Sequence, residues 1–162
     1  MKERLIDITC PHCGHVFTIK RDTICIAGMN DACDKHLADG TYFMHQCSKC
    51  KNLFPMVYPF LYRDPKKKYN LILSSKKEID NLPEDEQVVL CRDVRQFLFA
   101  YKVLSAGLHL KTMISLKKQW EKRFKNAQFE SYDSQSGIIW IQNEGHMIAL
   151  KLKEEERKRL HK

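Results

Sequence analysis

Two pairs of cysteines, each with two residues between them, constrain the fold of this chain more than any other feature. The first pair is Cys10-Pro11-His12-Cys13 and the second is Cys47-Ser48-Lys49-Cys50. A tight turn that carries two thiolates supplies half of the tetrahedron that Zn²⁺ prefers, and a second such turn completes it. We therefore predict one structural Zn²⁺ site whose ligands are Cys10, Cys13, Cys47 and Cys50.

The segment between the two pairs is longer than in compact zinc sites. Residues 14–46 separate them, whereas about 15–20 residues are usual. A short helix over Asp31–Leu37, with Asn30-Asp31 as its cap and Asp39-Gly40 as its end, accounts for the surplus as an insertion.

A thiol-dependent redox enzyme is the alternative interpretation of Cys10-Pro11-His12-Cys13. In disulfide exchange proteins such a pair lies at a helix N-terminus, which stabilises the thiolate. Here Val16–Lys20 alternates apolar and polar residues and predicts a strand. The sequence therefore favours the metal site over the redox pair.

The rest of the first region predicts a small β unit of the zinc-ribbon type. Ile6–Cys10 and Val16–Lys20 alternate like a hairpin with the first cysteine pair in its turn, and Thr41–Gln46 leads as a strand into the second pair. Pro55 and Pro59 interrupt the apolar segment Leu53–Tyr62, which therefore predicts an edge strand. A further strand is predicted at Tyr69–Leu73.

A second region follows a polar segment. We predict a zinc-ribbon-like region over residues 1–75, a linker over 76–90 and an α+β region over 91–162. In the last region, apolar residues at helical spacing between Val94 and Phe124, interrupted at Gly107, predict a helical hairpin. Three short antiparallel strands are predicted over residues 128–132, 138–142 and 146–152. The whole chain is thus expected to be an α+β protein.

Most of the positive charge lies in the second region. The formal net charge is +8, and it resides mainly beyond Pro65. Basic side chains gathered on one helix can neutralise phosphates, so the predicted second helix is a candidate nucleic-acid surface. A solvated helix face is the alternative. The residues concerned are Lys111, Lys117, Lys118, Lys122, Arg123 and Lys125.

The remaining cysteines and the N-terminus bear on location and on further sites. No apolar run approaches the roughly 20 residues of a membrane span, and MKERLIDITC lacks the apolar centre of a secretory signal, so we expect a cytoplasmic protein without a membrane partner. Cys25, Cys33 and His36 are candidates for a second site; the alternative is that they are buried thiols and a capping histidine, which is the simpler interpretation. Cys91 is expected to be a buried thiol.

The chain resembles the CpXC domain of bacteria and archaea. The resemblance rests on Cys10-Pro11-His12-Cys13-Gly14, on Asp39–Phe43 leading into the second cysteine pair, and on Tyr58–Lys67, and it covers roughly residues 6–120. Ser48 departs from the family pattern, which has proline there. The resemblance implies metal binding by the four cysteines and brings no catalytic residues.

These observations predict a non-catalytic binding module. The expected partner is a protein or a nucleic acid, and the oligomeric state is left open. The sequence contains no recognisable hydrolase or phosphate-binding constellation, and His109 and His146 stand alone.

Overall fold

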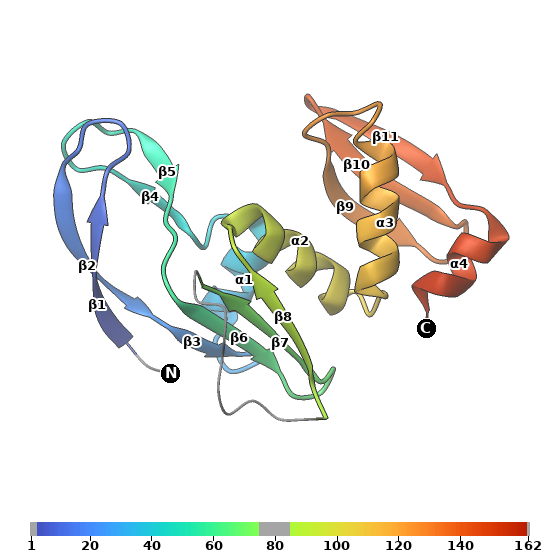
Figure 1. Cartoon of the computed structure of the whole chain (residues 1–162), viewed down its shortest axis with the longest axis horizontal. Coiled ribbons are helices and arrows are strands. Elements are labelled where there is room, and N and C mark those ends of the chain that lie inside the picture. Colours follow the sequence, from blue (N-terminus) through green and yellow to red (C-terminus); the bar gives the residue numbers. More distant parts are fainter. Residues whose placement is uncertain (1–2, 75–84, 162) are drawn as a thin grey trace. The chain divides into compact units, whose positions relative to one another are not determined.

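The computed structural model describes residues 3–74 and 85–161. Within them the chain is an α+β protein with four helices and several small sheets, as the sequence predicts (Figure 1). It forms two compact units, residues 1–98 and 99–162, so the division falls inside helix α2 (Val94–Ser105). Most of the predicted linker 76–90 lies outside the described residues. The predicted domains 1–75 and 91–162 stay a prediction.

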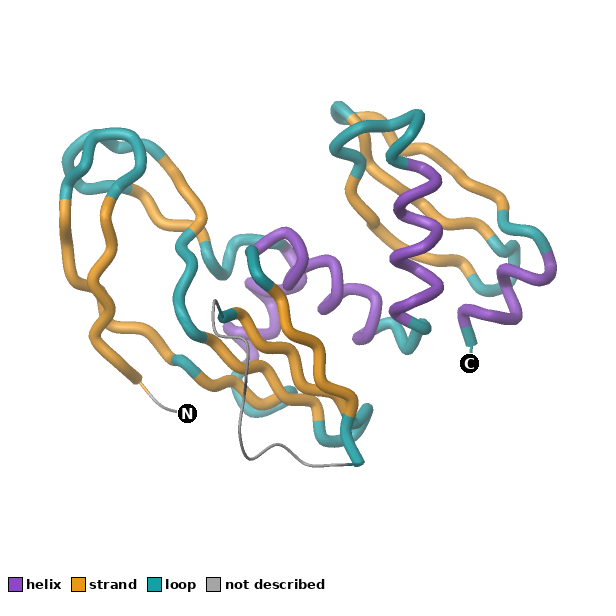
Figure 2. Tube along the Cα trace, in the orientation of Figure 1, coloured by secondary structure: helices purple, strands orange, loops and turns teal. Residues whose placement is uncertain are grey.

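Two short hairpin-like pairs of strands carry the cysteine turns of the first unit. Strands β1 (Glu3–Thr9) and β2 (Val16–Asp22) pair in antiparallel register, which confirms the predicted hairpin. Strands β4 (Met44–Gln46) and β5 (Leu53–Pro55) form a second antiparallel pair. The loop of each pair lies beside the loop of the other (Figure 2).

A four-stranded sheet forms the body of the first unit. Its order is β3 (Ile24–Ile26), β6 (Phe60–Asp64), β7 (Tyr69–Leu73) and β8 (Gln87–Cys91). The β3–β6 and β7–β8 pairs are parallel, and β6–β7 is antiparallel. All five residues of β7 are buried, as expected of an inner strand covered on both faces.

The prediction of one edge strand over Leu53–Tyr62 is wrong. The segment divides into β5, which ends at Pro55, and β6, which begins at Phe60 and is an inner strand. Pro59 lies immediately outside β6, so its missing N–H removes no hydrogen bond from the sheet. The prolines mark the change from one sheet to the other.

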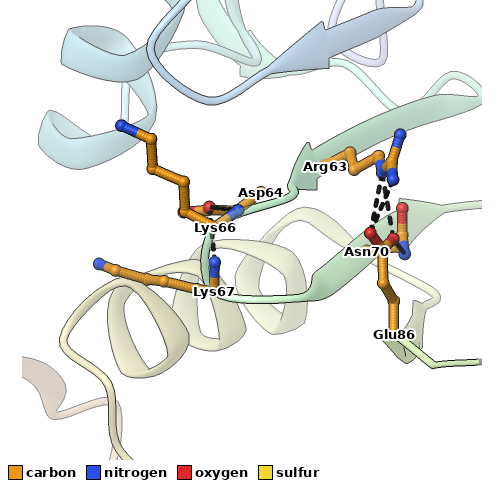
Figure 3. A network of polar contacts seen from close by, with 6 residues as sticks. All are labelled: Arg63, Asp64, Lys66, Lys67, Asn70 and Glu86. Atoms are coloured by element: carbon orange, nitrogen blue, oxygen red, sulfur yellow. Dashed lines mark hydrogen bonds and ion pairs between the residues drawn. The ribbon is translucent and has the colours of Figure 1, made fainter.

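An ion pair fastens the start of β8 to the middle of the sheet (Figure 3). Arg63 donates from Nη2 to Glu86 Oε1 at 2.7 Å, and Asn70 donates from Nδ2 to Glu86 Oε2 at 2.7 Å. The Glu86 side chain is 5% exposed. The hydrogen bonds from Arg63 and Asn70 hold the pKa of the Glu86 carboxyl below its usual range.

The turn between β6 and β7 is closed by an aspartate. Asp64 Oδ1 accepts from the backbone N–H groups of Lys66 and Lys67, at 3.1 and 3.0 Å (Figure 3). This is the Asx arrangement that favours aspartate before proline in turns. It gives a physical reason for the Asp64-Pro65 sequence.

Aromatic side chains fill the core of the first unit. The ring of Phe43 meets that of Phe60 at 5.5 Å and that of Phe97 at 5.3 Å, both edge to face. Phe60 and Phe97 are 5.6 Å apart. All three rings are at most 2% exposed, so the start of α2 packs on residues that follow α1 and precede β7.

Helix α1 (Asp31–Asp39) is the predicted insertion between the cysteine pairs. Asn30 caps it by accepting the Cys33 N–H at 3.1 Å, and Gly40 ends it in the left-handed conformation, with φ of 82°. Cys33 and Leu37 form its buried side. The predicted helix is confirmed, and it is two residues longer than expected.

The second unit joins two helices to a three-stranded sheet. Besides the end of α2 it contains α3 (Leu110–Trp120) and α4 (Glu154–Leu160). The predicted strands are confirmed, with β10 central in the order β11-β10-β9. Their bounds are Gln128–Asp133 for β9, Ile138–Asn143 for β10 and His146–Lys151 for β11.

Helix α3 is shorter than the predicted second helix of the hairpin. It ends at Trp120, and residues 121–126 form turns before β9. His109, which stands alone in the sequence, caps the helix by accepting the Thr112 N–H. In the part of the chain that the structure describes, no helix combines the length and apolarity that a membrane span requires.

Candidate metal centre

The first cysteine pair lies on a tight turn between β1 and β2. The Cys10 N–H donates to His15 O at 2.9 Å, and the Gly14 N–H donates to Cys10 O at 2.9 Å. Gly14 takes the left-handed conformation, with φ of 74°, which glycine adopts at little cost. The strand β2 follows this turn, so Cys10 and Cys13 are not at a helix N-terminus, and nothing supports the redox alternative at this pair.

The second pair repeats the same backbone geometry between β4 and β5. The Cys47 N–H donates to Asn52 O at 3.0 Å, and the Lys51 N–H donates to Cys47 O at 2.9 Å. Lys51 occupies the place that glycine has in the first turn, and its φ is 64°. We call these two turns, residues 10–15 and 47–52, the first and second knuckles.

The two knuckles bring the four predicted cysteines together. The Sγ atoms of Cys10 and Cys50 are 3.7 Å apart, and those of Cys13 and Cys47 are 3.6 Å apart. All four sulfurs lie within 4.8 Å of one another. A tetrahedral ion with bonds of about 2.3 Å to sulfur requires separations of about 3.8 Å along each edge. The four cysteines therefore lie close enough to hold a metal ion.

Hydrogen bonds to sulfur prepare the second knuckle to carry negative charge. The backbone N–H groups of Cys50 and Lys49 lower the pKa of the Cys47 thiol to about 6. Bonds from Asn52 likewise lower the pKa of the Cys50 thiol, and one of them runs from Nδ2 to Sγ at 3.4 Å. Because metals bind thiolates, these donors favour the ligating form.

The pKa of the Cys13 thiol in the first knuckle is shifted in the opposite direction. The His15 N–H lowers the pKa of the Cys13 thiol, but burial and the three neighbouring thiols outweigh it and raise that pKa to about 11. Four sulfurs this close cannot all be anionic without a cation between them. A divalent ion would supply that compensation.

The two histidines near the cysteine pairs in sequence, His15 and His45, lie in a group of aromatic rings. The Phe17 ring stacks on His45 at 4.7 Å and lies 5.9 Å from His15. Phe54 meets His45 edge to face at 5.8 Å. Among the described residues, the one group close enough to hold a metal ion consists of the four cysteines, and neither histidine belongs to it.

Two further cysteines are buried elsewhere in the first unit. Cys25 on β3 and Cys33 on α1 are 1% and 3% exposed. The Tyr42 hydroxyl lies 3.8 Å from Cys25 Sγ. His36 is exposed and bonds Thr41 Oγ1 at 2.9 Å instead. The sequence marks both cysteines and misses Tyr42, because no spacing rule links residues from separate elements.

Other candidate residues occupy ordinary positions. Cys91 is 2% exposed, as predicted, and burial raises the pKa of its thiol to about 12.

Of the basic residues proposed for nucleic acid, Lys117 is half-buried, pairs with Glu121 at 3.4 Å and lies over the Phe99 ring. The other five are exposed, on α3 or on the turn that follows it: Lys111, Lys118, Lys122, Arg123 and Lys125.

The fold and the site define a class of protein: an α+β protein in which two cysteine knuckles meet at one potential metal centre. The chain belongs to the CpXC protein family, whose model matches residues 8–128. The resemblance noted in the sequence is thereby confirmed. No curated protein and no solved structure matches the chain.

Proposed function

We propose that Cys10, Cys13, Cys47 and Cys50 hold one structural Zn²⁺ and that the protein is a non-catalytic binding module. The single observation that carries the proposal is the group of four sulfurs within 4.8 Å, drawn from two equivalent knuckles. Four thiolates are the ligand set of structural zinc, and they leave no open position for water or substrate. Such a site holds a fold together and performs no hydrolysis.

The β1–β2 and β4–β5 pairs would form a zinc-ribbon-like unit around the ion. Each pair consists of short strands, and β4 and β5 have three residues each. A two-stranded pair of this size is marginal in water without further support. Zinc binding contributes about 10–16 kcal/mol in small zinc domains, so the ion would be the main source of stability for this unit. A reducing compartment such as the cytoplasm would keep the thiols available.

Metal analysis of the purified protein tests this proposal. We expect one Zn²⁺ per chain, and we expect Cys47→Ser to lose the metal because three remaining ligands bind it weakly. Cys91→Ser is the matched control, since it removes one buried thiol far along the chain from both knuckles and should keep the metal. Retention of a full equivalent of zinc by Cys47→Ser would show that the ligand set is wrong.

Nucleic acid is the partner that the charge distribution supports. Five of the six basic residues proposed from the sequence are exposed on α3 and the following turn. Phosphate contacts by such side chains make affinity depend steeply on salt. If four phosphates are contacted, affinity should fall roughly a hundredfold between 50 and 200 mM salt.

Fluorescence anisotropy with single- and double-stranded oligonucleotides measures this dependence. Lys118→Glu with Lys122→Glu should abolish binding, whereas Lys66→Glu with Lys67→Glu changes the charge equally on an exposed turn of the first unit and should have little effect. Equal losses from both double variants would indicate an unspecific charge effect. An affinity independent of salt would exclude nucleic acid and leave a protein as the partner.

A further inference from the structure

Two neighbouring cavities lie beside α3 in the second unit. Their volumes are about 220 Å³ and about 210 Å³, and both are lined by Leu116, Gln119 and Glu156. Leu116 and Gln119 belong to α3, and Glu156 belongs to α4. Because the two cavities share these residues, we describe them together as the α3 groove, with the larger as its first cavity and the smaller as its second.

The size of the two cavities limits what each can hold. Sites that enclose a whole small molecule usually have volumes of ~300–1,000 Å³. Each cavity of the α3 groove is smaller than that, so each suits one ring system or one anionic group. A chain molecule that carries both kinds of group in succession could occupy the two cavities at once.

The first cavity is polar and basic. Lys111 and Arg159 line it together with the hydroxyl-bearing Ser115. The His109 N–H donates to Leu160 O at 2.9 Å, which holds the end of α4 beside the start of α3. Two cations and a hydroxyl on two joined helices form a suitable site for a phosphate group.

The second cavity is apolar and aromatic. Trp120, Phe124 and Leu150 are among the residues that line it. The Arg123 guanidinium, at the same cavity, lies over the Phe124 ring at 5.3 Å from its centroid. Unpaired bases stack on aromatic rings and on guanidinium planes, so this cavity has the surfaces that a base requires.

The charge of the α3 groove favours an anionic ligand. One acidic residue lines it, Glu156, and its Oε1 accepts the Lys153 N–H at 3.0 Å. Four basic residues line it, and none of them forms an ion pair with another residue of the ranges 3–74 and 85–161. These four residues are Lys111, Arg123, Lys151 and Arg159.

We propose that the α3 groove binds single-stranded nucleic acid, with a base in the second cavity and a neighbouring phosphate in the first. This inference rests on the nucleic-acid partner proposed above and specifies the kind of strand and its site. In a duplex the bases are paired and stacked, and taking one out costs free energy. A single strand can place a base in the cavity without that cost.

Fluorescence anisotropy with three labelled ligands tests the inference on the full chain. The ligands are a short single-stranded oligothymidylate, the same backbone with abasic sites in place of all bases, and a hairpin duplex. We expect removal of the bases to lower affinity about five- to a hundredfold, and the duplex to bind more weakly than the single strand.

The outcomes separate this inference from the proposed function. Equal affinity for the oligothymidylate and the abasic backbone, or tighter binding of the duplex, would overturn the base site and leave nucleic acid as the partner. No binding of any of the three would overturn both. Polyglutamate that binds as tightly as the oligothymidylate would indicate an acidic peptide as the occupant and would also overturn the inference.

Variants at Phe124 test the base cavity. Phe124→Leu keeps an apolar side chain and removes the ring, so affinity for the oligothymidylate should fall about fivefold or more, while affinity for the abasic backbone should stay the same. Phe99→Leu is the matched control, because Phe99 also lies under a cation, Lys117, but lines neither cavity. Equal losses from both variants would contradict a base at Phe124.

Variants on α4 test the phosphate cavity. Arg159→Ala removes an exposed cation from the first cavity and should lower by about 1 the slope of log affinity against log salt. Lys158→Ala removes the same charge from the preceding residue, which lines neither cavity, and should leave the slope unchanged. An unchanged slope in Arg159→Ala would overturn the phosphate contact and with it the placement of the strand.

Discussion

The two knuckles share one backbone geometry but differ in sequence at the positions between and after the cysteines. In each, the first cysteine donates its N–H five residues ahead and accepts an N–H from four residues ahead. The first knuckle has Pro11 and Gly14 at positions where the second has Ser48 and Lys51. The difference shows that the cysteine spacing and the strand on each side define the turn, while the other positions adjust its stability.

Lys51 is the less suitable residue of the two at the left-handed position. Its φ of 64° costs a residue with a Cβ about 1–2 kcal/mol, whereas Gly14 has no such penalty. This cost is small compared with the binding free energy of structural zinc, which is about 10–16 kcal/mol. A bound metal would therefore tolerate an imperfect knuckle.

Metal removal is expected to change the two knuckles more than any substitution. Chelation with excess EDTA should expose the N–H groups of Cys10 and Gly14 and those of Cys47 and Lys51 to hydrogen exchange together, because one ion holds both turns. Hydrogen exchange read by mass spectrometry checks this. The amides of β10 in the second unit are the internal control, and they should keep their protection.

A difference between the two knuckles in their loss of hydrogen-exchange protection would contradict the idea that they share one ion. If only one turn loses protection, the two do not share an ion. If neither turn does, the hydrogen bonds and the ring contacts of Phe17, His45 and Phe54 hold the region without metal.

The cysteine spacing was enough to predict the knuckles and the meeting of all four sulfurs. Local patterns also predict α1, through Asn30 and Gly40, and the strands of the second unit, through their turns. These features depend on residues close in sequence, where capping and alternation act directly.

The features that the sequence does not predict depend on residues from separate elements. Pro59 suggests an edge strand, although β6 begins one residue later and becomes internal by pairing with β3 and β7. Cys25 and Tyr42 likewise come from separate segments, the strand β3 and the residues after α1, and their side chains lie 3.8 Å apart. Periodicity carries no information about such pairings.

Substitution of Gly14 by alanine should weaken the first knuckle. A Cβ at this position meets nothing within 4 Å, so the expected cost comes from the left-handed backbone alone, about 1–2 kcal/mol. Zinc affinity measured by competition with a coloured chelator should fall about five- to thirtyfold. Gly145→Ala, at a similar φ in the second unit, is the matched control and should leave zinc affinity unchanged.

The reverse change at Lys51 should strengthen the second knuckle. Lys51→Gly relieves the left-handed strain but adds backbone entropy to the unfolded chain, so the net gain is about 0.5–1 kcal/mol, or two- to fivefold in zinc affinity. Lys49→Gly is the control, since Lys49 is not among the residues with positive φ and should gain nothing. A loss of affinity in Lys51→Gly would mean that the lysine side chain, and not its backbone, matters at this position.

Proline in place of Ser48 has the smallest expected effect. The two knuckles share their hydrogen bonds, so the place of Pro11 in the first turn indicates that the backbone at Ser48 accepts a proline ring. Ser48→Pro then restricts the unfolded chain and should stabilise the metal-bound form by about 0.5 kcal/mol, a little over twofold in zinc affinity. Pro11→Ser makes the opposite change in the first knuckle and should lose a similar amount, since the same entropy term is removed. If Ser48→Pro and Pro11→Ser both lower the zinc affinity, each knuckle requires its own residue at this position. The two turns would then be equivalent in their hydrogen bonds but not in the residue that follows the first cysteine.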